Sequence, residues 1–354
     1  MIQVFKSINF DWLGWRRVFI GISVFLMLAG LGSAIFRQLR NPDGAFNLGV
    51  DFKGGTVVTT KFNRPMTADG IRTILAERGV SDATIQGVTD RPDTFLIKLP
   101  LEGSGGEQSE QEVELGRKRV RDSLNAIGPE REAYEILGTE AVGAVAGAQL
   151  RNKAIAVTLA ALVGMLVYIA FRFEWTYGAA AVIAVFHDVL VTLGFFSIFQ
   201  WEISLTVIAA LLTLVGASVN DTIVVFDRVR ENRRLHRRDS LYKITNDSIN
   251  QTLSRTVITQ GLIILSVLAM VIFGGDVLRG FSLALLIGTI VGTYSSIAVA
   301  SPIMVWWEQR IEAANRAAAL GAAPVTSRSP RSGSAKVKPE PLSARAEKHP
   351  RGAV

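Results

Sequence analysis

Two carboxylates lie inside long apolar runs of this sequence, where ionisable side chains are rare. Asp221 follows Asn220 in "LTLVGASVNDTIVVFDRVREN", and Asp188 follows His187 in "VFHDV". A charged carboxylate in hydrocarbon costs roughly 2.5–3.5 kcal/mol on insertion scales, so such a residue either lies at an interface or has a task. The task that fits these residue types is proton transfer, because a buried carboxyl or a histidine can exchange a proton near neutral pH.

Asp221 belongs to a face of small and polar residues. Three- and four-residue spacing, which marks one side of a helix, brings together Thr213, Gly216, Ala217, Asn220 and Asp221. Small residues on such a face let helices approach closely, and polar ones hydrogen-bond across the contact. Counting back from Phe226 places Asp221 roughly 7–8 Å inside the end of the apolar run. Burial there favours a carboxyl that takes up and releases a proton, whereas a helix-end carboxylate paired with a loop arginine fits equally well.

Three further polar positions complete the set of candidates. Arg255 opens the next apolar run at a depth similar to that of Asp221, and its long stem can carry the charge inward. A simple flanking charge is the alternative. Gln260 is a buried amide that needs a partner. His187 and Asp188 are consecutive on a helix, so we expect them to point about 100° apart and not to share one contact face. A structural hydrogen bond between helices is the alternative to a proton route for this pair.

The elements that carry these residues are six apolar runs, each near the roughly 20 residues of a bilayer crossing. They are Val18–Phe36, Ala154–Phe171, Thr176–Phe199, Ile203–Phe226, Thr256–Phe273 and Gly280–Trp306. The 354-residue chain is 49% hydrophobic, with a mean hydropathy of +0.31. We therefore predict an α-helical integral membrane protein with six transmembrane helices, at residues 18–36 and within residues 151–308. The first run exceeds the roughly 7–15-residue core of a signal peptide, so we predict a retained anchor.

Basic residues orient the predicted helices, because Lys and Arg in short loops mark the cytoplasmic side. They occur in residues 1–17, in a loop at 227–255 and in a tail at 309–354, which we predict to be cytoplasmic, with the tail disordered. Both termini are then cytoplasmic. The net charge of +7 follows from this pattern and does not indicate nucleic-acid binding. Within the loop, apolar residues between Asp239 and Ser254 indicate a partly amphipathic helix on the membrane surface.

Residues 37–150 form the predicted extracytoplasmic domain between the first two spans. Alternating residues predict strands at Thr56–Phe62, "ATIQGV", "TFLIKLP" and "AYEILG", with Pro92 in a turn. One helix is capped by Thr67 and ends at Gly79, and a second, "EVELGRKRVRDSLNAIG", follows the flexible loop "EGSGGEQSEQ". The order β-α-β-β-α-β predicts a small α+β domain of the ferredoxin-like kind. That fold alone names no function.

A glycine-rich segment, "NLGVDFKGGT", stands at the entry to this domain. Gly49, Gly54 and Gly55 permit tight turns, and Asp51, beside Phe52, could cap one. A phosphate cradle would need a following Lys-Ser/Thr and a helix start, and we expect neither. We therefore interpret the segment as a rigid junction. The sequence has no cysteine, which excludes disulfides and thiolate metal sites, and we predict no metal and no cofactor.

These residues resemble the SecF family of the bacterial SecDF protein-export machinery. The resemblance is carried in order over residues 47–302 by "GVDFKGG", "YIAFRFEW", "VFHDV", "SVNDTIVVFDRVREN", "SINQTLSRT" and "FGGDVLRGFSLALLIGTIVGTYSSI". The membrane core is also similar to one half of the resistance-nodulation-division transporters. The resemblance implies a non-enzymatic auxiliary subunit in the bacterial inner membrane. Such a subunit uses the proton-motive force with SecD to promote export through SecYEG, and it assists membrane-protein insertion.

The resemblance also implies partners and residue roles. The partners are SecD, which supplies the other six spans of a shared groove, the SecYEG translocon, YajC, YidC, a translocating polypeptide and membrane lipid. Asp221 and Arg255 match residues implicated in proton coupling, and Asp51 lies in the D-F-x-G-G motif of the family. Two departures are the absence of a proline at Leu137–Gly143 and the presence of Gln260 where small hydroxyl residues are typical.

Two other functions are compatible with parts of the sequence. A proton-coupled small-molecule exporter would need the missing half, supplied by a homodimer, and a roomy substrate pocket in the outer domain. An intramembrane hydrolase built on His187 and Asp188 would need a nucleophilic serine or a second metal ligand, and the sequence shows neither. Isolation of the chain with an obligate SecD-like partner or as a homodimer separates the first two functions.

Overall fold

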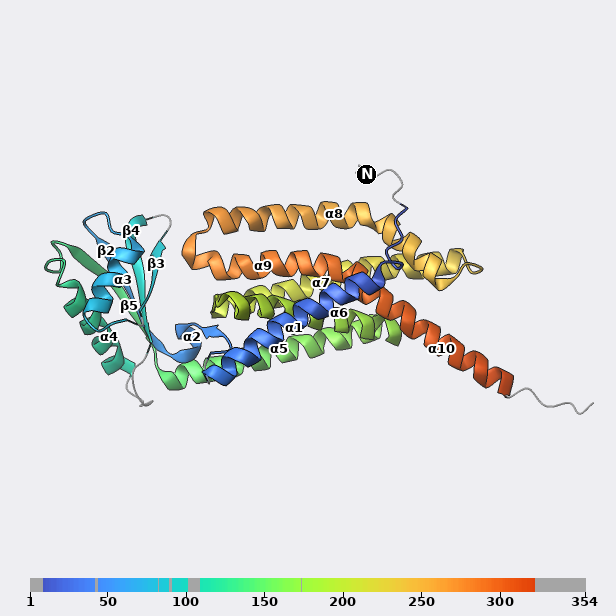
Figure 1. Cartoon of the computed structure of the whole chain (residues 1–354), viewed down its shortest axis with the longest axis horizontal. Coiled ribbons are helices and arrows are strands. Elements are labelled where there is room, and N and C mark those ends of the chain that lie inside the picture. Colours follow the sequence, from blue (N-terminus) through green and yellow to red (C-terminus); the bar gives the residue numbers. More distant parts are fainter. Residues whose placement is uncertain are drawn as a thin grey trace, which may run out of the picture. The chain divides into compact units, whose positions relative to one another are not determined.

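The computed structural model describes residues 9–41, 44–81, 83–88, 91–100, 109–172 and 174–321. The chain up to Ile311 forms one compact unit, and the residues from Glu312 onward belong to a second unit. In the first unit, a set of long helices lies side by side, and a small sheet with two helices is inserted after the first of them (Figure 1).

Six stretches of the described chain form helices long and apolar enough to cross a membrane, which confirms the predicted number of spans. Their elements are α1 (Arg16–Arg40), α5 (Ala144–Arg172), α6 (Trp175–Phe199), α7 (Leu205–Leu235), α8 (Leu241–Phe273), and the continuous series α9 (Gly275–Ser295), η1 (Ser296–Ala300) and α10 (Ser301–Gly321). The chain is therefore a multi-pass membrane protein.

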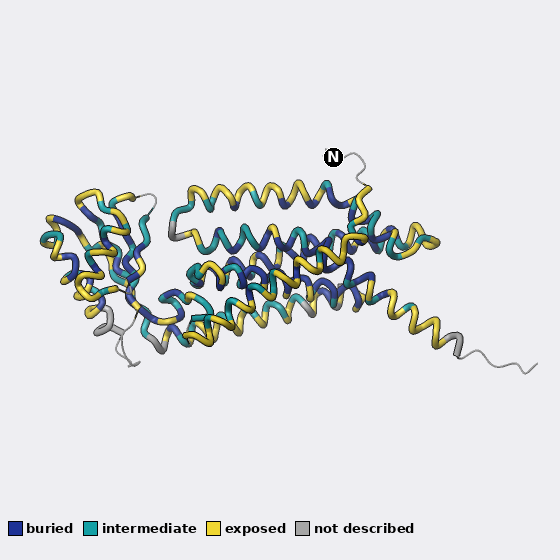
Figure 2. Tube along the Cα trace, in the orientation of Figure 1, coloured by how far each residue is buried: buried dark blue, intermediate teal, exposed yellow. Residues whose placement is uncertain are grey.

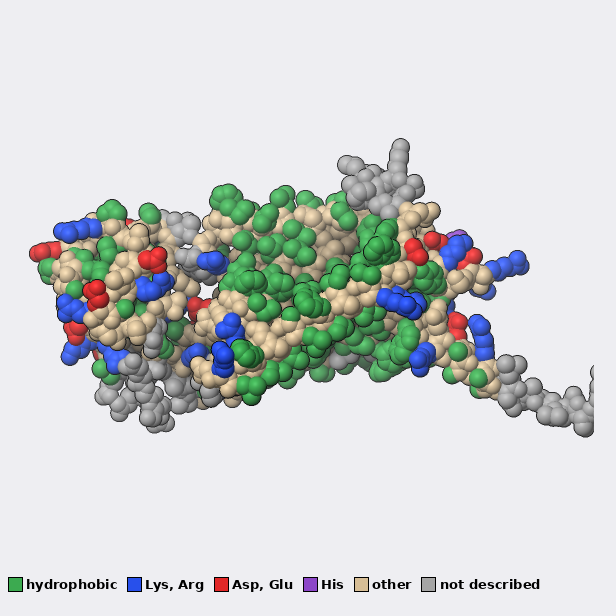
Figure 3. All heavy atoms as spheres, viewed as in Figure 1, with side chains coloured by type: hydrophobic (Ala, Val, Ile, Leu, Met, Phe, Trp, Pro, Cys, Tyr) green, Lys and Arg blue, Asp and Glu red, His purple; other side chains and the backbone are tan. Residues whose placement is uncertain are grey.

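Burial shows which helices are central. Half of the most apolar window of α6 and of α7 is buried inside the chain, against 11% for α1 and 6% for α5. Large hydrophobic side chains of α1 and α8, such as Phe25 and Leu265, are exposed. Exposed residues follow one another along both helices (Figure 2). These side chains form an apolar outer surface over the helices (Figure 3). Such a surface suits lipid, because a helix satisfies its own backbone hydrogen bonds and needs no polar neighbour.

Glycines allow α1 to touch the central helix α6. A Cβ atom added at Gly30 would lie 2.5 Å from the Cα of Gly194, and one added at Gly194 would lie 2.9 Å from the Cα of Gly30. The two backbones therefore meet where both side chains are missing, as small residues permit in membranes. A glycine also shapes the contact of α7 with α9, where a Cβ at Gly288 would lie 2.4 Å from the side chain of Leu214.

A π-helical turn, η1, interrupts the last predicted span. All five of its residues are buried, and the Ser301 hydroxyl donates to the carbonyl of Ser296, five residues earlier, at 2.9 Å. π-helical turns are rare and often lie at functional sites. This one follows Ser295, which takes part in the polar cluster described below.

The inserted domain contains β2 (Gly55–Phe62), α3 (Ala68–Glu77), β3 (Thr84–Val88), β4 (Arg91–Pro100), α4 (Ser109–Leu124) and β5 (Tyr134–Val142). Its strand order is β3-β4-β2-β5, and all neighbouring strands are antiparallel. Alternate residues of β2 and β4, such as Val58 and Ile97, are buried against Leu75 of α3 and Leu124 of α4. Both helices thus cover one face of the sheet.

Local features of this domain agree with the sequence in part. Thr67 caps α3, since its hydroxyl accepts from the amide of Gly70 at 3.1 Å, and Gly79 adopts a left-handed φ of 80° after the helix. Pro92 lies inside β4 and not in a turn. Helix α4 begins at Ser109, within the segment predicted as a flexible loop, whereas residues 101–108 lie outside the described residues.

A junction connects this domain to the membrane helices. Strand β1 (Asn47–Leu48) pairs in parallel with β6 (Glu202–Ile203), which lies between α6 and α7. The four-residue helix α2 (Val50–Lys53) follows β1, so the expectation that no helix starts here was wrong. Gly54, with a φ of 81°, ends this turn and leads into β2.

Two predictions for the basic segments also need correction. Residues 241–254 are the first part of α8, and Ile244, Ile249 and Leu253 are buried in the main helical core. Their apolar face therefore packs on protein and not on the membrane surface. Helix α10 continues to Gly321, past residue 309, where the disordered tail was predicted to begin. Residues 322–354 of that tail lie outside the described residues.

Candidate functional site

Asp221 lies in the contact between α7 and α8. Its side chain belongs to a residue that is 3% exposed, and no described group hydrogen-bonds to its Oδ2. Gln260 of α8 lies within hydrogen-bonding reach of the carboxyl, and Arg255 is close enough to act on it electrostatically. Gln260 Oε1 also has no partner within the described chain. The site therefore combines an ionisable carboxyl, a neighbouring positive charge and unused hydrogen-bonding capacity.

Three other residues of the predicted polar face of α7 point outward, and Ala217 is half-buried. Thr213, Gly216 and Asn220 are exposed, as is Arg255 on α8. A Cβ added at Gly216, or at Gly261 of α8, would meet no described atom within 4 Å. Among these positions the structure brings Asp221, Arg255 and Gln260 together, and it leaves Asn220 at the surface. The small residues thus form an open face beside the buried carboxyl.

His187 and Asp188 form a second polar cluster with other partners. Asp188 is fully buried, and its Oδ2 accepts from Ser218 of α7 at 2.5 Å and from Ser295 of α9 at 2.8 Å. Its Oδ1 lies 2.9 Å from His187 Nδ1. We expected these consecutive residues not to share one contact face, and their side chains nevertheless turn toward each other despite the 100° between them. One carboxylate thereby joins α6, α7 and α9.

This cluster extends to α1 through Tyr294. The rings of His187 and Tyr294 lie 6.2 Å apart, and the Tyr294 hydroxyl donates to the carbonyl of Phe19 at 2.9 Å and contacts the Ser23 hydroxyl. His187 Nε2 is buried and has no hydrogen-bond partner within the described part of the chain. The imidazole is therefore held at one nitrogen and free at the other.

One turn of α7 separates the two clusters. Ser218, which binds Asp188, precedes Asp221 by three residues. At 1.5 Å of rise per residue this is a spacing of about 4.5 Å along the helix. A shift of α7 would therefore move both sites together.

The segment "FDRVRENR" (residues 226–233) contributes contacts at the end of α7 that the sequence did not reveal. Asn232 donates to Ser248 Oγ at 2.8 Å and to Gln251 Oε1 at 3.0 Å, which fastens α7 to α8. Arg233 pairs with Glu308 of α10 at 2.8 Å, and Glu308 also accepts from Thr176 of α6 at 2.9 Å. Polar residues in a run that ends a span are the signal that could have indicated this interhelical network.

The segment "NDSINQTL" (residues 246–253) binds the residues that precede α1. Asn246 accepts from the amide of Trp12 at 2.9 Å and donates to the carbonyl of Phe10 at 3.0 Å. Asn250 accepts from the Trp12 indole at 3.0 Å and donates to the same carbonyl at 3.0 Å. The two asparagines, one helical turn apart, thus bind the backbone that leads into α1.

The D-F-x-G-G residues lie at the junction, away from Asp221 but at the other end of its helix. Asp51 Oδ2 accepts from the amide of Leu205 at 3.0 Å, so it caps the N-terminus of α7 and not a local turn. The amide of Gly49 donates to the carbonyl of Ile203 at 2.9 Å. Phe52 is buried in a cluster that includes Ile203. Gly55 has a φ of 157°, and a Cβ there would lie 2.4 Å from the carbonyl oxygen of Leu99.

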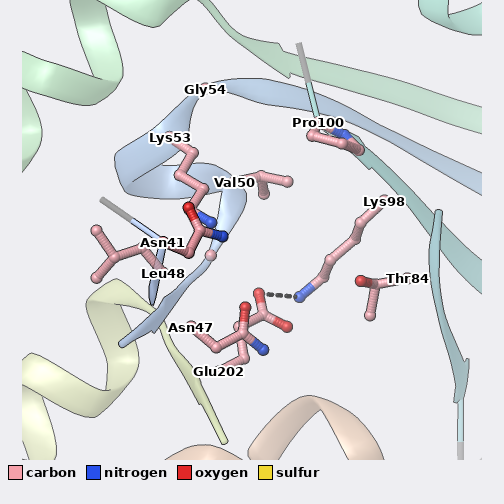
Figure 4. A pocket seen from close by; sticks show the side chains of 11 residues that line it. Asn41, Asn47, Leu48, Val50, Lys53, Gly54, Thr84, Lys98, Pro100 and Glu202 are labelled. Carbon is pink, nitrogen blue, oxygen red and sulfur yellow. Dashed lines mark hydrogen bonds and ion pairs between the residues drawn. The ribbon is translucent and has the colours of Figure 1, made fainter. Parts of the chain in front are cut away.

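A polar cavity of about 440 Å³ lies beside this junction (Figure 4). The residues that line it are Asn41, Asn47, Leu48, Gly49, Val50, Lys53, Gly54, Thr84, Lys98, Pro100 and Glu202. Lys98 of β4 extends across it to Glu202 of β6, with Nζ 2.9 Å from Oε1. Across residues 9–321, as far as they are described, no group of three or more His, Asp or Glu side chains is arranged to hold a metal ion.

Sequence profiles of known families match two regions of the chain. The profile described as protein export membrane protein SecD/SecF, C-terminal, matches residues 121–310, and that described as the SecD/SecF GG motif matches residues 45–66. A protein translocase subunit SecF from Koribacter versatilis is 38% identical over an alignment 395 residues long, which covers 91% of this chain and 98% of the relative. One from Escherichia coli O157:H7 is 40% identical over 294 residues, covering 83% of this chain and 86% of the relative.

Two solved structures are similar. The crystal structure of SecDF, a translocon-associated membrane protein from Thermus thermophilus, aligns with a TM-score of 0.70 at 38% identity. SecDF in a super-membrane-facing form aligns with a TM-score of 0.64 at 37% identity. Each alignment covers 88% of this chain and 40% of the SecDF chain, so this chain spans less than half of that longer protein.

Proposed function

The chain belongs to the SecD/SecF family of protein-export membrane proteins and has an auxiliary role in the Sec translocase; we propose that it fulfils this role by coupling proton movement at Asp221 to export. The observation that carries the proposal is the buried Asp221 carboxyl, with an unpartnered oxygen and with Arg255 and Gln260 as neighbours. A charged carboxylate in a membrane interior costs free energy, and protonation removes that cost because it neutralises the group. A carboxyl at this position is therefore suited to reversible protonation. In its charged form the carboxylate is stabilised by Arg255.

SecD is the proposed direct partner. The face of α7 that contains Thr213, Gly216 and Asn220 is exposed, and it continues at Gly261 of α8. Polar and small residues gain little from lipid, whereas they allow close packing with further helices. The SecDF structures, in which this chain corresponds to 40% of one protein, support a partner that supplies the remainder. Through SecD we propose contact with SecYEG, YajC and YidC, with a translocating polypeptide as the cargo.

The domain formed by β2–β5 with α3 and α4 is proposed to be a ferredoxin-like domain outside the cytoplasm. Its β-α-β-β-α-β order and the antiparallel strand order β3-β4-β2-β5 support the fold. Basic residues near Asp239 lie between the end of α7 and the start of α8, at the ends of these helices that are remote from the domain. They support a cytoplasmic location for that side and hence the inner membrane for the chain.

A reporter fusion tests this orientation. A reporter active only in the periplasm should be active when fused after Glu107 and silent when fused after Asp239, because one membrane-crossing helix precedes the first position and four precede the second. Both positions lie in connections between apolar helices. The reverse activity pattern would refute the proposed sidedness. A cytoplasm-active reporter at the same two positions provides the matched control.

The proposed function is tested in proteoliposomes that contain the Sec channel and its energy source. Export of a secreted protein should be stimulated by an imposed proton gradient when this chain and SecD are both present, and not when either is left out. Protease protection of the exported protein measures the effect, and collapse of the gradient with a protonophore is the control. Equal stimulation without this chain would contradict the proposal. Gradient-driven export of small molecules by a homodimer of the chain would favour the exporter function instead.

A further inference from the structure

The outer domain and the helix that carries Asp221 meet at one short segment, Glu202–Leu205. This segment is contacted by the junction and, separately, by side chains of the sheet. Asp51 caps the first amide of α7, at Leu205, at 3.0 Å, and the Gly49 amide donates to the Ile203 carbonyl at 2.9 Å. These contacts come from the junction, and the parallel pairing of β1 with β6 reinforces them. Ser204, at the N-cap of α7, makes no side-chain capping bond of its own, so the start of this helix depends on Asp51.

The sheet reaches the same segment through side chains. Lys98 of β4 pairs with Glu202 Oε1 at 2.9 Å, and Gln86 of β3 donates to Glu202 Oε2 at 3.4 Å. In Figure 4, Lys98 extends from its strand across the cavity to the carboxylate. One carboxylate therefore receives two long, flexible side chains from two strands. It lies three residues before the start of α7.

The geometry points to a contact that can open. The Lys98 and Glu202 side chains keep 17% and 20% of their exposure, and the cavity of about 440 Å³ beside them is lined by polar groups such as Asn47 and Thr84. The two charges would remain close to water when they separate, so breaking this pair costs less free energy than breaking a fully buried one. The junction, by comparison, is fixed by backbone hydrogen bonds and can serve as a pivot.

Gly49 adapts the junction to the carboxylate. A Cβ added at this position would lie 2.6 Å from Glu202 Oε1, although the backbone, with φ of −70°, would accept alanine. The glycine therefore makes room for Glu202 and is not required for an unusual backbone conformation. Gly49→Ala should displace the carboxylate without changing any charge.

We propose that Glu202 is a positioning residue that couples the outer domain to α7, and that its contact with Lys98 opens and closes as Asp221 takes up and releases its proton. This inference rests on the proposed function of Asp221. Asp51 and the β1–β6 pair keep the start of α7 attached to the junction, so a shift of α7 carries Glu202 with it. The sheet contacts Glu202 through the flexible side chains of Lys98 and Gln86, so Glu202 can move relative to the sheet. The sheet then alternates between a docked and a released position over the cavity.

Charge exchange tests the contact in the complex with SecD. Glu202→Lys and Lys98→Glu should each lower the proton-stimulated part of export, by about two- to fivefold if the pair contributes as a partly exposed ion pair does. The double variant should restore most of it, which a general loss of folding would not allow. Glu202→Gln removes the charge of the carboxylate, and Gly49→Ala displaces it, so each should lower the proton-stimulated part of export to a similar extent. Co-purification with SecD serves as the folding control for every variant.

Cysteine labelling tests the movement, since the chain has no cysteine of its own. Val50 lines the cavity, and Glu77 is exposed on α3 away from it. A proton gradient should raise severalfold the rate at which a membrane-impermeant maleimide labels Val50→Cys, and it should leave Glu77→Cys unchanged. Combined with Asp221→Asn, the response at Val50→Cys should disappear.

The outcomes separate this inference from the proposed function. The role of Glu202 is overturned if charge exchange does not change export and the labelling rate of Val50→Cys is the same with and without the gradient. If Asp221→Asn abolishes stimulated export in that case, the proposed function of Asp221 stands. If Asp221→Asn exports normally, both proposals fall. Rescue by the double variant together with gradient-dependent labelling supports the coupling through Glu202.

Discussion

Replacing Asp221 by Asn should abolish the proton-dependent stimulation of export while the chain still folds, inserts and binds SecD. Asparagine keeps the size and hydrogen-bonding ability of the buried side chain, but it cannot take up a proton. Each proton that crosses a potential of 100 mV releases about 2.3 kcal/mol, which biases two conformations by roughly fiftyfold. That bias is what the variant should lose. Export driven by an imposed gradient in proteoliposomes measures it directly.

Matched variants identify the cause of such a loss. Asp221→Glu should retain part of the stimulation, because it can still ionise. Arg255→Gln should reduce it, since the charged carboxylate loses the neighbour that stabilises it. Asp239→Asn makes the same chemical change at a surface residue, paired with Lys243 at 3.1 Å, and should have no effect. Full stimulation in Asp221→Asn would show that Asp221 is only a helix-end residue.

Asp188→Ala should cause the largest loss of stability in the membrane part. The carboxylate accepts from Ser218 and Ser295 and contacts His187, so its removal leaves buried polar groups on three helices without their partner. At about 1 kcal/mol for each interhelical hydrogen bond and more for an unsatisfied buried group, we expect a loss of about 2–4 kcal/mol. Denaturant unfolding in detergent, followed by helical signal, measures this loss.

Asp188→Asn distinguishes a structural role from proton transfer. The amide oxygen can still accept from the two serines, so the loss of stability should be much smaller, about 1 kcal/mol. Because the acceptors of Asp188 are occupied while an oxygen of Asp221 is not, we expect this variant to keep its response to a proton gradient. Normal stability combined with loss of the proton response would instead make Asp188 a proton carrier.

Features that depend on local sequence could be predicted from the sequence. The six apolar helices follow from hydropathy, because a crossing helix must be apolar over its whole length. The strands β2 and β4 follow from alternation, and Thr67 was identified as an N-cap from its place before a helical pattern. Asp221 was found because a carboxylate in an apolar run is energetically conspicuous wherever the run packs. Each of these signals is contained within about 20 residues.

Only the tertiary structure decided which distant residues meet. Asp51 caps α7 across 154 positions of sequence, Asn250 binds Trp12 across 238, and Asp188 receives a hydroxyl from Ser295. The apolar residues of segment 241–254 predicted an amphipathic helix correctly, yet not that protein covers its face. The physical reason is common to all these cases. Periodicity defines the faces of an element, whereas the neighbour of each face is set by how the helices pack, and the free energy of that packing is spread over many contacts far apart in the chain.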